Sequence, residues 1–164
     1  MKVLRLFGVG LLVTLLLPSL TLAASNIGER SENGPGVTWT LRIPGFNDLM
    51  SITYGNGLFV AVGGSHSSST IYTSSNGVNW TEHPSPVREQ LWGVTYGNGL
   101  FVAVGDSGTI LTSRDGKNWT KQVSPTSKRL RSITYGNGLF VGVGNDGIIL
   151  TSPDGRNWDV DPLD

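Results

Sequence analysis

The sequence predicts an all-β protein built from repeated four-stranded antiparallel sheets, and three observations lead to this prediction. A segment that begins Leu49-Met-Ser-Ile-Thr-Tyr-Gly-Asn-Gly recurs, with changes, from Leu91 and again from Leu130. Residues 91–119 match residues 130–158 at 20 of 29 positions, and the tyrosines of the three copies lie 42 and 39 residues apart. Beyond the first 24 residues, no window has the apolar period of a helix. A period near 40 made only of strand signals predicts β-propeller blades.

The first 24 residues are predicted to be a secretory signal peptide. Lys2 and Arg5 precede the apolar run Leu6–Leu17, and small residues follow at Ala23 and Ala24. This is the order of a cleaved leader, and the apolar run is shorter than the roughly 20 residues that a spanning helix needs. We therefore expect cleavage near Ala23 or Ala24, a secreted or periplasmic protein, and no membrane association after cleavage.

Two segments precede the repeats. Residues 25–36 contain Gly34-Pro35-Gly36 without an apolar period, which predicts a flexible lead-in. Val37–Leu41 resembles the fourth strand of a blade standing alone, so residues 37–164 are predicted to be a partial propeller of one orphan strand and three blades, at about 49–82, 91–123 and 130–160. Closed propellers typically have about 4–8 blades, so we expect an incomplete ring.

Each repeat is predicted to be a four-stranded meander. Asn-Gly and Asp-Gly pairs separate apolar, β-branched runs, and these pairs favour tight hairpin turns because both central residues need positive φ. In the second repeat the expected strands are Leu91–Tyr96, Leu100–Val104, Thr109–Ser113 and Asn118–Val123.

Composition and charge exclude several classes of function. Twelve basic and twelve acidic residues give a formal net charge of zero. Loss of Lys2 and Arg5 with the leader would leave ten against twelve, or −2, so no nucleic-acid partner is expected. The chain has no cysteine, and its only histidines, His66 and His83, lie in different predicted loops. We expect no disulfide, no metal site and no cofactor.

Each repeat ends in a short motif that resembles a known family. Ser113-Arg-Asp115-Gly116-Lys-Asn-Trp119 and its two counterparts resemble the Asp-box, or bacterial neuraminidase repeat, Ser-x-Asp-x-Gly-x-Thr-Trp. This chain has a shortened variant, because it lacks the residue between Asp and Gly and has Asn in place of the final Thr; the first copy also has Asn76 in place of Asp. The resemblance implies a propeller of the class that includes sialidases and photosystem II assembly-factor-like proteins.

The resemblance also implies a structural role for the motif. In the family the Asp-box holds the turn between the third and fourth strands, on the face away from the ligand site. An Asp carboxylate can accept hydrogen bonds from backbone N–H groups of its own turn, and residues that recur in every blade serve the blade. The residues assigned to this structural Asp-box are Ser75, Asn76, Trp80, Ser113, Asp115, Gly116, Trp119, Ser152, Asp154, Gly155 and Trp158.

Positions that differ between the repeats indicate where a binding site would lie. The second residue of the first strand is Met50, Trp92 or Arg131, and the connections between blades are also unlike one another. In a meander blade these positions meet on one rim, where propellers of the resembled class bind ligands. A Trp can stack on a sugar or peptide, and Arg can pair with a carboxylate. The candidate binding residues are Trp92, Arg131, Met50, Arg88, Arg129 and His66.

Several functions agree with this pattern. The sequence favours an exported, non-catalytic module that binds a glycan, a peptide or a protein through its variable rim. The alternatives are a fragment of a sialidase-type hydrolase, a photosystem II assembly-factor-like propeller, and a truncated gene product. No catalytic residue is assigned, since the arginines of the predicted rim come from only two neighbouring connections. Self-association, or another chain that carries blades, is expected to complete the ring.

Overall fold

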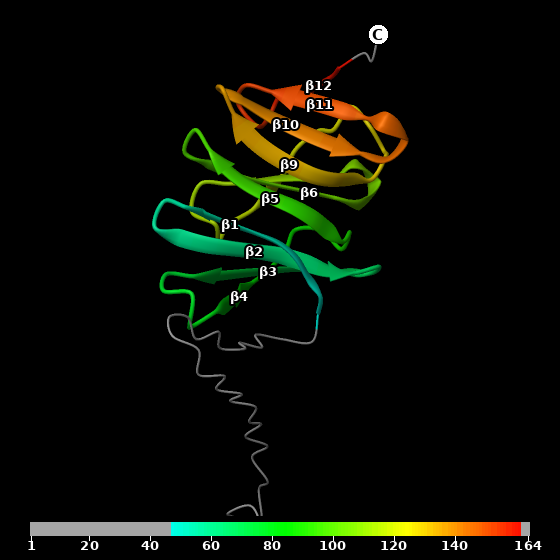
Figure 1. The fold of residues 1–164 in the computed structure, drawn as a ribbon. Helices are drawn as coiled ribbons and strands as arrows, with labels where there is room; N and C mark the ends of the chain where they lie inside the picture. The colour runs from blue at the N-terminus through cyan, green and yellow to red at the C-terminus, as the bar shows by residue number, and fades with distance from the viewer. Residues whose placement is uncertain (1–46, 162–164) are drawn as a thin grey trace, which may run out of the picture. The chain divides into compact units, whose positions relative to one another are not determined.

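Three sheets, each formed by one repeat, make up the part of the chain that the computed structural model describes, residues 47–161 (Figure 1). Each sheet is a four-stranded antiparallel meander, in which every strand pairs with the next one along the chain. The strands are β1 (Leu49–Gly55), β2 (Leu58–Ser65), β3 (Ser68–Ser74), β4 (Thr81–His83), β5 (Leu91–Gly97), β6 (Leu100–Gly105), β7 (Ile110–Ser113), β8 (Thr120–Lys121), β9 (Leu130–Gly136), β10 (Leu139–Gly144), β11 (Ile149–Ser152) and β12 (Asp159–Val160). The prediction of an all-β chain of propeller blades is confirmed.

The first turn of each blade has the geometry that its sequence predicts. Asn98 and Gly99 join β5 to β6 with φ values of 49° and 73°. Positive φ at both central residues marks a turn whose twist matches that of the flanking strands. Asn56-Gly57 and Asn137-Gly138 have the same conformation in the other two blades.

The second turn differs between the blades. In the second and third blades it is a short 3-10 element, η1 (Asp106–Gly108) and η2 (Asn145–Gly147), with Ser107 and Asp146 at positive φ. In the first blade β2 and β3 instead extend to Ser65 and Ser68, which pair across a longer hairpin. The three-residue insertion in the first repeat therefore lengthens this ribbon.

The fourth strands are shorter than predicted. The sequence suggested Asn118–Val123, whereas β8 contains only Thr120–Lys121. The cause is the preceding turn, because the backbone N–H of Asn118 donates to Asp115 and is unavailable to the sheet. Beyond β8, the N–H of Gln122 still donates to the Ile110 carbonyl at 2.9 Å.

The hydrophobic core lies between neighbouring sheets. Figure 1 shows the sheets stacked in chain order, with the β5–β8 sheet between the other two. One cluster joins Val60, Val62 and Ile71 of the first blade to residues of the second, including Phe101 and Trp119. A second cluster repeats this arrangement between the second and third blades. The ring is not closed, and among residues 47–161 one face of the first sheet and one face of the third have no neighbouring sheet.

Three predictions fall outside the described residues: the signal peptide at 1–24, the lead-in at 25–36 and the orphan strand at Val37–Leu41. Within residues 47–161 there is no helix of the length and hydrophobicity that a membrane span requires.

Candidate binding site on the loop rim

The variable second residue of each first strand occupies a β-bulge. In the second blade Leu91 pairs with Gly105 and Gly93 with Val104, so Trp92 is the extra residue. Met50 and Arg131 are the extra residues at the equivalent places in β1 and β9. A bulge bends its strand and re-aims the side chain of the extra residue. The fold therefore presents a different side chain from the same irregular position in each blade.

Trp92 and Arg129 share one carboxylate. The indole Nε1–H of Trp92 donates to Oδ1 of Asp106 at 2.9 Å. The Nε of Arg129, from the connection to the third blade, lies 2.5 Å from the same oxygen. Asp106 is the first residue of η1, so this contact joins the second turn of one blade to the connection that leads into the next blade. The Asp106 carboxylate thus orients both side chains across the blade boundary.

Arg131 adds a second guanidinium beside the same indole. Its Nε donates to Oδ1 of Asn145 at 2.6 Å. The guanidinium carbons of Arg129 and Arg131 lie 5.1 Å and 5.9 Å from the centroid of the Trp92 ring, within the range of cation–π attraction. We call Trp92, Arg129 and Arg131, with Asp106 and Asn145 that hold them, the rim cluster.

The charge of the rim cluster is positive. Asp106 balances Arg129, but Asn145 is neutral. Within residues 47–161, no carboxylate lies within ion-pair distance of Arg131, whose side chain is exposed. Arg131 therefore has guanidinium N–H groups available for an anionic partner, and an Arg fork binds a carboxylate in bidentate geometry.

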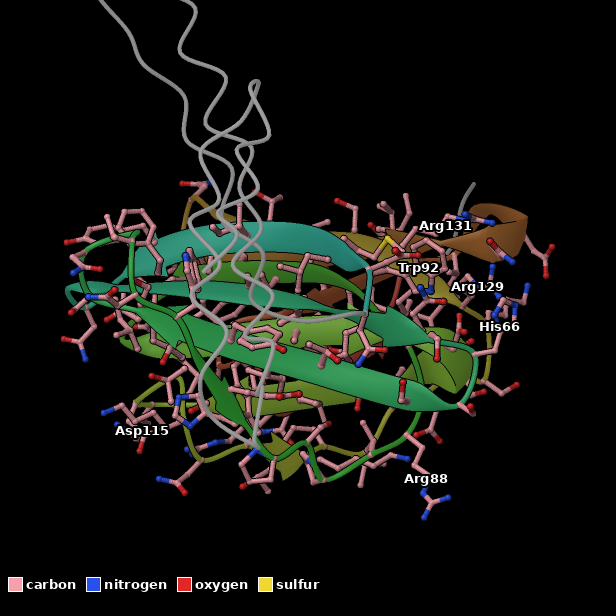
Figure 2. All side chains as sticks on the ribbon, turned by 90° about the horizontal axis from the view of Figure 1, so that it is seen from below. His66, Arg88, Trp92, Asp115, Arg129 and Arg131 are labelled. Carbon is pink, nitrogen blue, oxygen red and sulfur yellow. The ribbon has the colours of Figure 1, made fainter. Side chains whose placement is uncertain are left out.

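The other predicted rim residues lie at the same end of the sheets. Among the described residues, they form no hydrogen bond or ion pair with the rim cluster. Figure 2 shows His66 and Arg88 at the end that carries Trp92, Arg129 and Arg131. His66 lies in the exposed hairpin between β2 and β3, and Arg88 in the exposed connection from β4 to β5. Met50 is 36% exposed at its bulge. The structure thus brings together three of the six candidates.

The box motif lies at the opposite end of the sheets, where Figure 2 labels Asp115. Oδ1 of Asp115 accepts the backbone N–H groups of Lys117 and Asn118 at 2.9 Å and 2.8 Å, and Oδ2 accepts Nδ2 of Asn118 at 2.7 Å. These donors, Asn118 foremost, hold the pKa of Asp115 well below its ordinary value. Asp154 makes the same set of contacts in the third blade, with the same lowered pKa.

In the first blade the serine of the box is Ser74, so the prediction of Ser75 is wrong. The hydroxyl of Ser74 accepts the Gly77 N–H at 2.9 Å, as Ser113 and Ser152 accept the equivalent glycine N–H groups in the later blades. The first box lacks a carboxylate, and the Asn76 side-chain oxygen takes its place, accepting the N–H groups of Val78 and Asn79 at 2.9 Å each. Ser75 occupies the exposed position next to it.

Each box tryptophan bonds back to its own turn. Nε1 of Trp119 donates to the Gly116 carbonyl at 2.9 Å, and Trp158 bonds to Gly155 at 3.1 Å. Both indoles are 8% exposed and belong to the cores between blades. Trp80 makes the same bond to Gly77 at 3.3 Å but is only half-buried, because no sheet of the described part of the chain covers that side of the first blade.

A cavity of about 280 Å³ also opens at the box end, lined in part by Arg114, Asp115 and Arg156. These arginines are exposed and lie away from the rim cluster, which makes them useful controls for any charge effect at the rim.

Among residues 47–161, no group of three His, Asp or Glu side chains is placed to hold a metal ion. His83 bonds through Nε2 to the Thr73 hydroxyl at 2.8 Å.

Comparison with known proteins identifies the fold. No protein-family model and no curated protein sequence matches the chain, so the Asp-box resemblance stays a prediction. A solved structure of YCF48 bound to D1 peptide is similar, with a TM-score of 0.62 and 18% identity over 77% of this chain. YCF48 from Cyanidioschyzon merolae is similar with a TM-score of 0.58 and 21% identity over 73% of this chain. The matched regions span 44% and 38% of those two proteins. The likeness establishes β-propeller architecture for the three sheets.

Proposed function

We propose that this protein is an exported, non-catalytic β-propeller module that binds a carboxylate-bearing peptide segment of a partner protein at the rim cluster. The observation that carries the proposal is the convergence of Trp92, Arg129 and Arg131 from two blades onto one place. Two of the three are bulge residues, and all three belong to the positions at which the repeats differ.

The chemistry of the cluster favours a peptide carboxylate over a sugar. A sugar stacks on a free aromatic face, but two guanidiniums already lie over the Trp92 ring. Arg131, with only the neutral Asn145 as its partner among the described residues, suits an anion. An aspartate, a glutamate or a C-terminal carboxylate can pair with the guanidinium, while an adjacent apolar side chain packs on the edge of the indole.

A similar structure supports the choice of a peptide as ligand class. The YCF48 structure is described as bound to D1 peptide. A sequence identity of 18% supports a shared fold and not a shared ligand. D1 peptide is therefore used here as one probe among several.

The test measures binding of short acidic, neutral and basic fluorescent peptides of equal length, with a D1 peptide included, to the purified protein by fluorescence anisotropy. We expect acidic peptides to bind best, and Arg131→Ala to weaken that binding at least about tenfold through loss of a charge-assisted pair. Arg156→Ala removes the same charge at the box end and should leave binding unchanged.

Three results would contradict the proposal: equal loss in both arginine variants, a preference for basic peptides, or no binding to any peptide. Hydrolysis of a fluorogenic sialoside by the purified protein would favour the sialidase alternative instead. Export is tested separately, by cell fractionation and by the N-terminal sequence of the recovered protein, which should begin at Ala24 or Ser25.

A further inference from the structure

The two interfaces between blades use the same contact between a glycine and a tyrosine. At Gly55 an added Cβ would lie 2.0 Å from Cγ of Tyr96 in the next blade. At Gly97 it would lie 2.0 Å from Cγ of Tyr135. Each tyrosine also packs on the phenylalanine of its own blade with ring centroids 4.6 Å apart. The equivalent strand of the third blade, β9, ends at Gly136, where an added Cβ would meet no atom of residues 47–161 within 4 Å.

The box glycine makes a second contact that recurs. Gly116 approaches Leu58 and Val60 of the preceding blade, and Gly155 approaches Leu100 and Val102. An added Cβ at either glycine would lie 2.9 Å from the leucine Cδ2. At the equivalent glycine of the first blade, Gly77, an added Cβ would have only Phe59 of its own blade within 4 Å among the described residues.

Strand β1 therefore exposes its part of an interface that is buried between the other blades, while Ala61 and Tyr72 on the same face of the first sheet are buried. Ile52 is 58% exposed, whereas its equivalent Val94 is 5% exposed. Tyr54 is exposed, while Tyr96 and Tyr135 are half-buried. Leu49 is exposed, although Leu91 and Leu130 are fully buried. We call Leu49, Ile52 and Tyr54 the leading face.

The third sheet presents the opposite half. Val143 is 41% exposed, whereas Val104 is fully buried, and Leu139 is 39% exposed against 6% for Leu100. Gly136 is exposed, although Gly55 and Gly97 are buried. We call Gly136, Leu139 and Val143 the trailing face. Exposed apolar surface of this kind marks an interaction site.

We propose that the leading face of one copy of this chain docks on the trailing face of a second copy, and that two copies close a six-bladed ring. The two interfaces inside the chain show which residue types pack against the trailing face of a blade. The leading face carries these residue types. Tyr54 of one copy would lie on Gly136 of the other, as Tyr96 lies on Gly55. Each copy uses two different faces, so the contact forms twice around a two-fold axis.

We infer the number of copies from the three blades of residues 47–161. Two copies supply six of these blades, within the range of about 4–8 that closed propellers use, whereas three copies would supply nine. A further contact agrees with this docking. The Val94 N–H donates to the Ser51 hydroxyl at 3.2 Å across the first interface. Ser132 is the equivalent of Ser51 on the third blade and is exposed, so it can accept the Ile52 N–H of a second copy.

The test is the mass of the purified protein in solution, measured by light scattering coupled to size exclusion over a range of concentrations. We expect a dimer, and we expect Gly136→Ala to raise its dissociation constant at least about 100-fold, because the new Cβ would collide with Tyr54 at both contacts. Gly136 is not at positive φ, and an added Cβ would meet none of the described residues within 4 Å, so the variant should fold normally. Gly142→Ala is the control, because its equivalents Ala61 and Ala103 already have that Cβ.

A cross-link gives a second readout in this cysteine-free chain. The double variant Ile52→Cys/Ser132→Cys should yield a covalent dimer on mild oxidation. Its two positions are equivalent to Val94 and Ser51, which face each other across the first interface. The double variant Ser51→Cys/Val94→Cys should therefore cross-link within one chain and is the positive control. A monomer at high micromolar concentration would overturn the proposal. So would a trimer, an open polymer, or a dimer that Gly136→Ala leaves intact.

Discussion

The aromatic ring of Tyr135 covers Gly97 of the preceding blade so closely that an added Cβ would lie 2.0 Å from its Cγ and 2.3 Å from its Cδ1. The glycine is needed for this approach and not for its backbone angles, since Gly97 is not at positive φ. The repeated Tyr-Gly pair therefore sets how closely two sheets pack.

Gly97→Ala should destabilise the protein by about 1–3 kcal/mol, because the methyl group forces the two blades apart. Urea unfolding at neutral pH measures the effect. Gly142→Ala adds the same methyl group where the nearest atom, the Ser132 carbonyl oxygen, is 3.8 Å away, so it should change stability little. If the two variants unfold alike, the close Tyr135 contact does not limit blade spacing.

Trp119→Ala should cost about 3–5 kcal/mol, since it leaves a large cavity between the first and second blades. Trp80→Ala should cost clearly less, because Trp80 is half-buried on a sheet face that no other sheet of residues 47–161 covers. Both losses are read from urea unfolding of dilute protein. Equal losses of stability in the two variants would show that the indole stabilises its own turn and not the packing between sheets.

Acid should weaken the second and third blades through Asp115 and Asp154. Because the N–H donors of each turn lower the pKa of both carboxyl groups in the folded protein, the unfolded chain binds their protons at a higher pH. Their contribution is complete above the ordinary Asp pKa of about 3.9 and is lost as the pH falls below it. We expect the difference in stability between the parent and Asp115→Asn/Asp154→Asn to shrink from pH 7 to pH 3. A constant difference would contradict this.

Asn76→Asp should strengthen the first blade at neutral pH by about 0.5–1 kcal/mol. The new carboxylate would keep the two backbone contacts that Asn76 now makes. It would also offer Asn79 a second oxygen, as Asp115 offers Asn118. Ser75→Asp adds the same charge one residue earlier, at an exposed position outside these contacts, and is the control. An equal gain in both variants would indicate a general charge effect.

Much of the fold could be read from the sequence because it depends on local chemistry. Asn98-Gly99 needs positive φ at two successive residues, and that requirement alone specifies a tight hairpin. The repetition of such turns established the order of strands and the blades. Comparison of the repeats also directed attention to Trp92 and Arg131 as positions that the blade itself does not require.

Other features depended on the tertiary structure. The bulges at Met50, Trp92 and Arg131 arise from the register of two strands, which no single segment encodes. The meeting of Trp92 with Arg129 requires Asp106 at the boundary between two blades, a contact between residues far apart in the chain. The exposure of Ile52 against the burial of Val94 follows from whether a sheet lies alongside. The repeated hairpins are therefore predictable from the amino-acid sequence, because their energetics are local. Only packing between blades decided which of the repeated side chains are covered and which remain available to a partner.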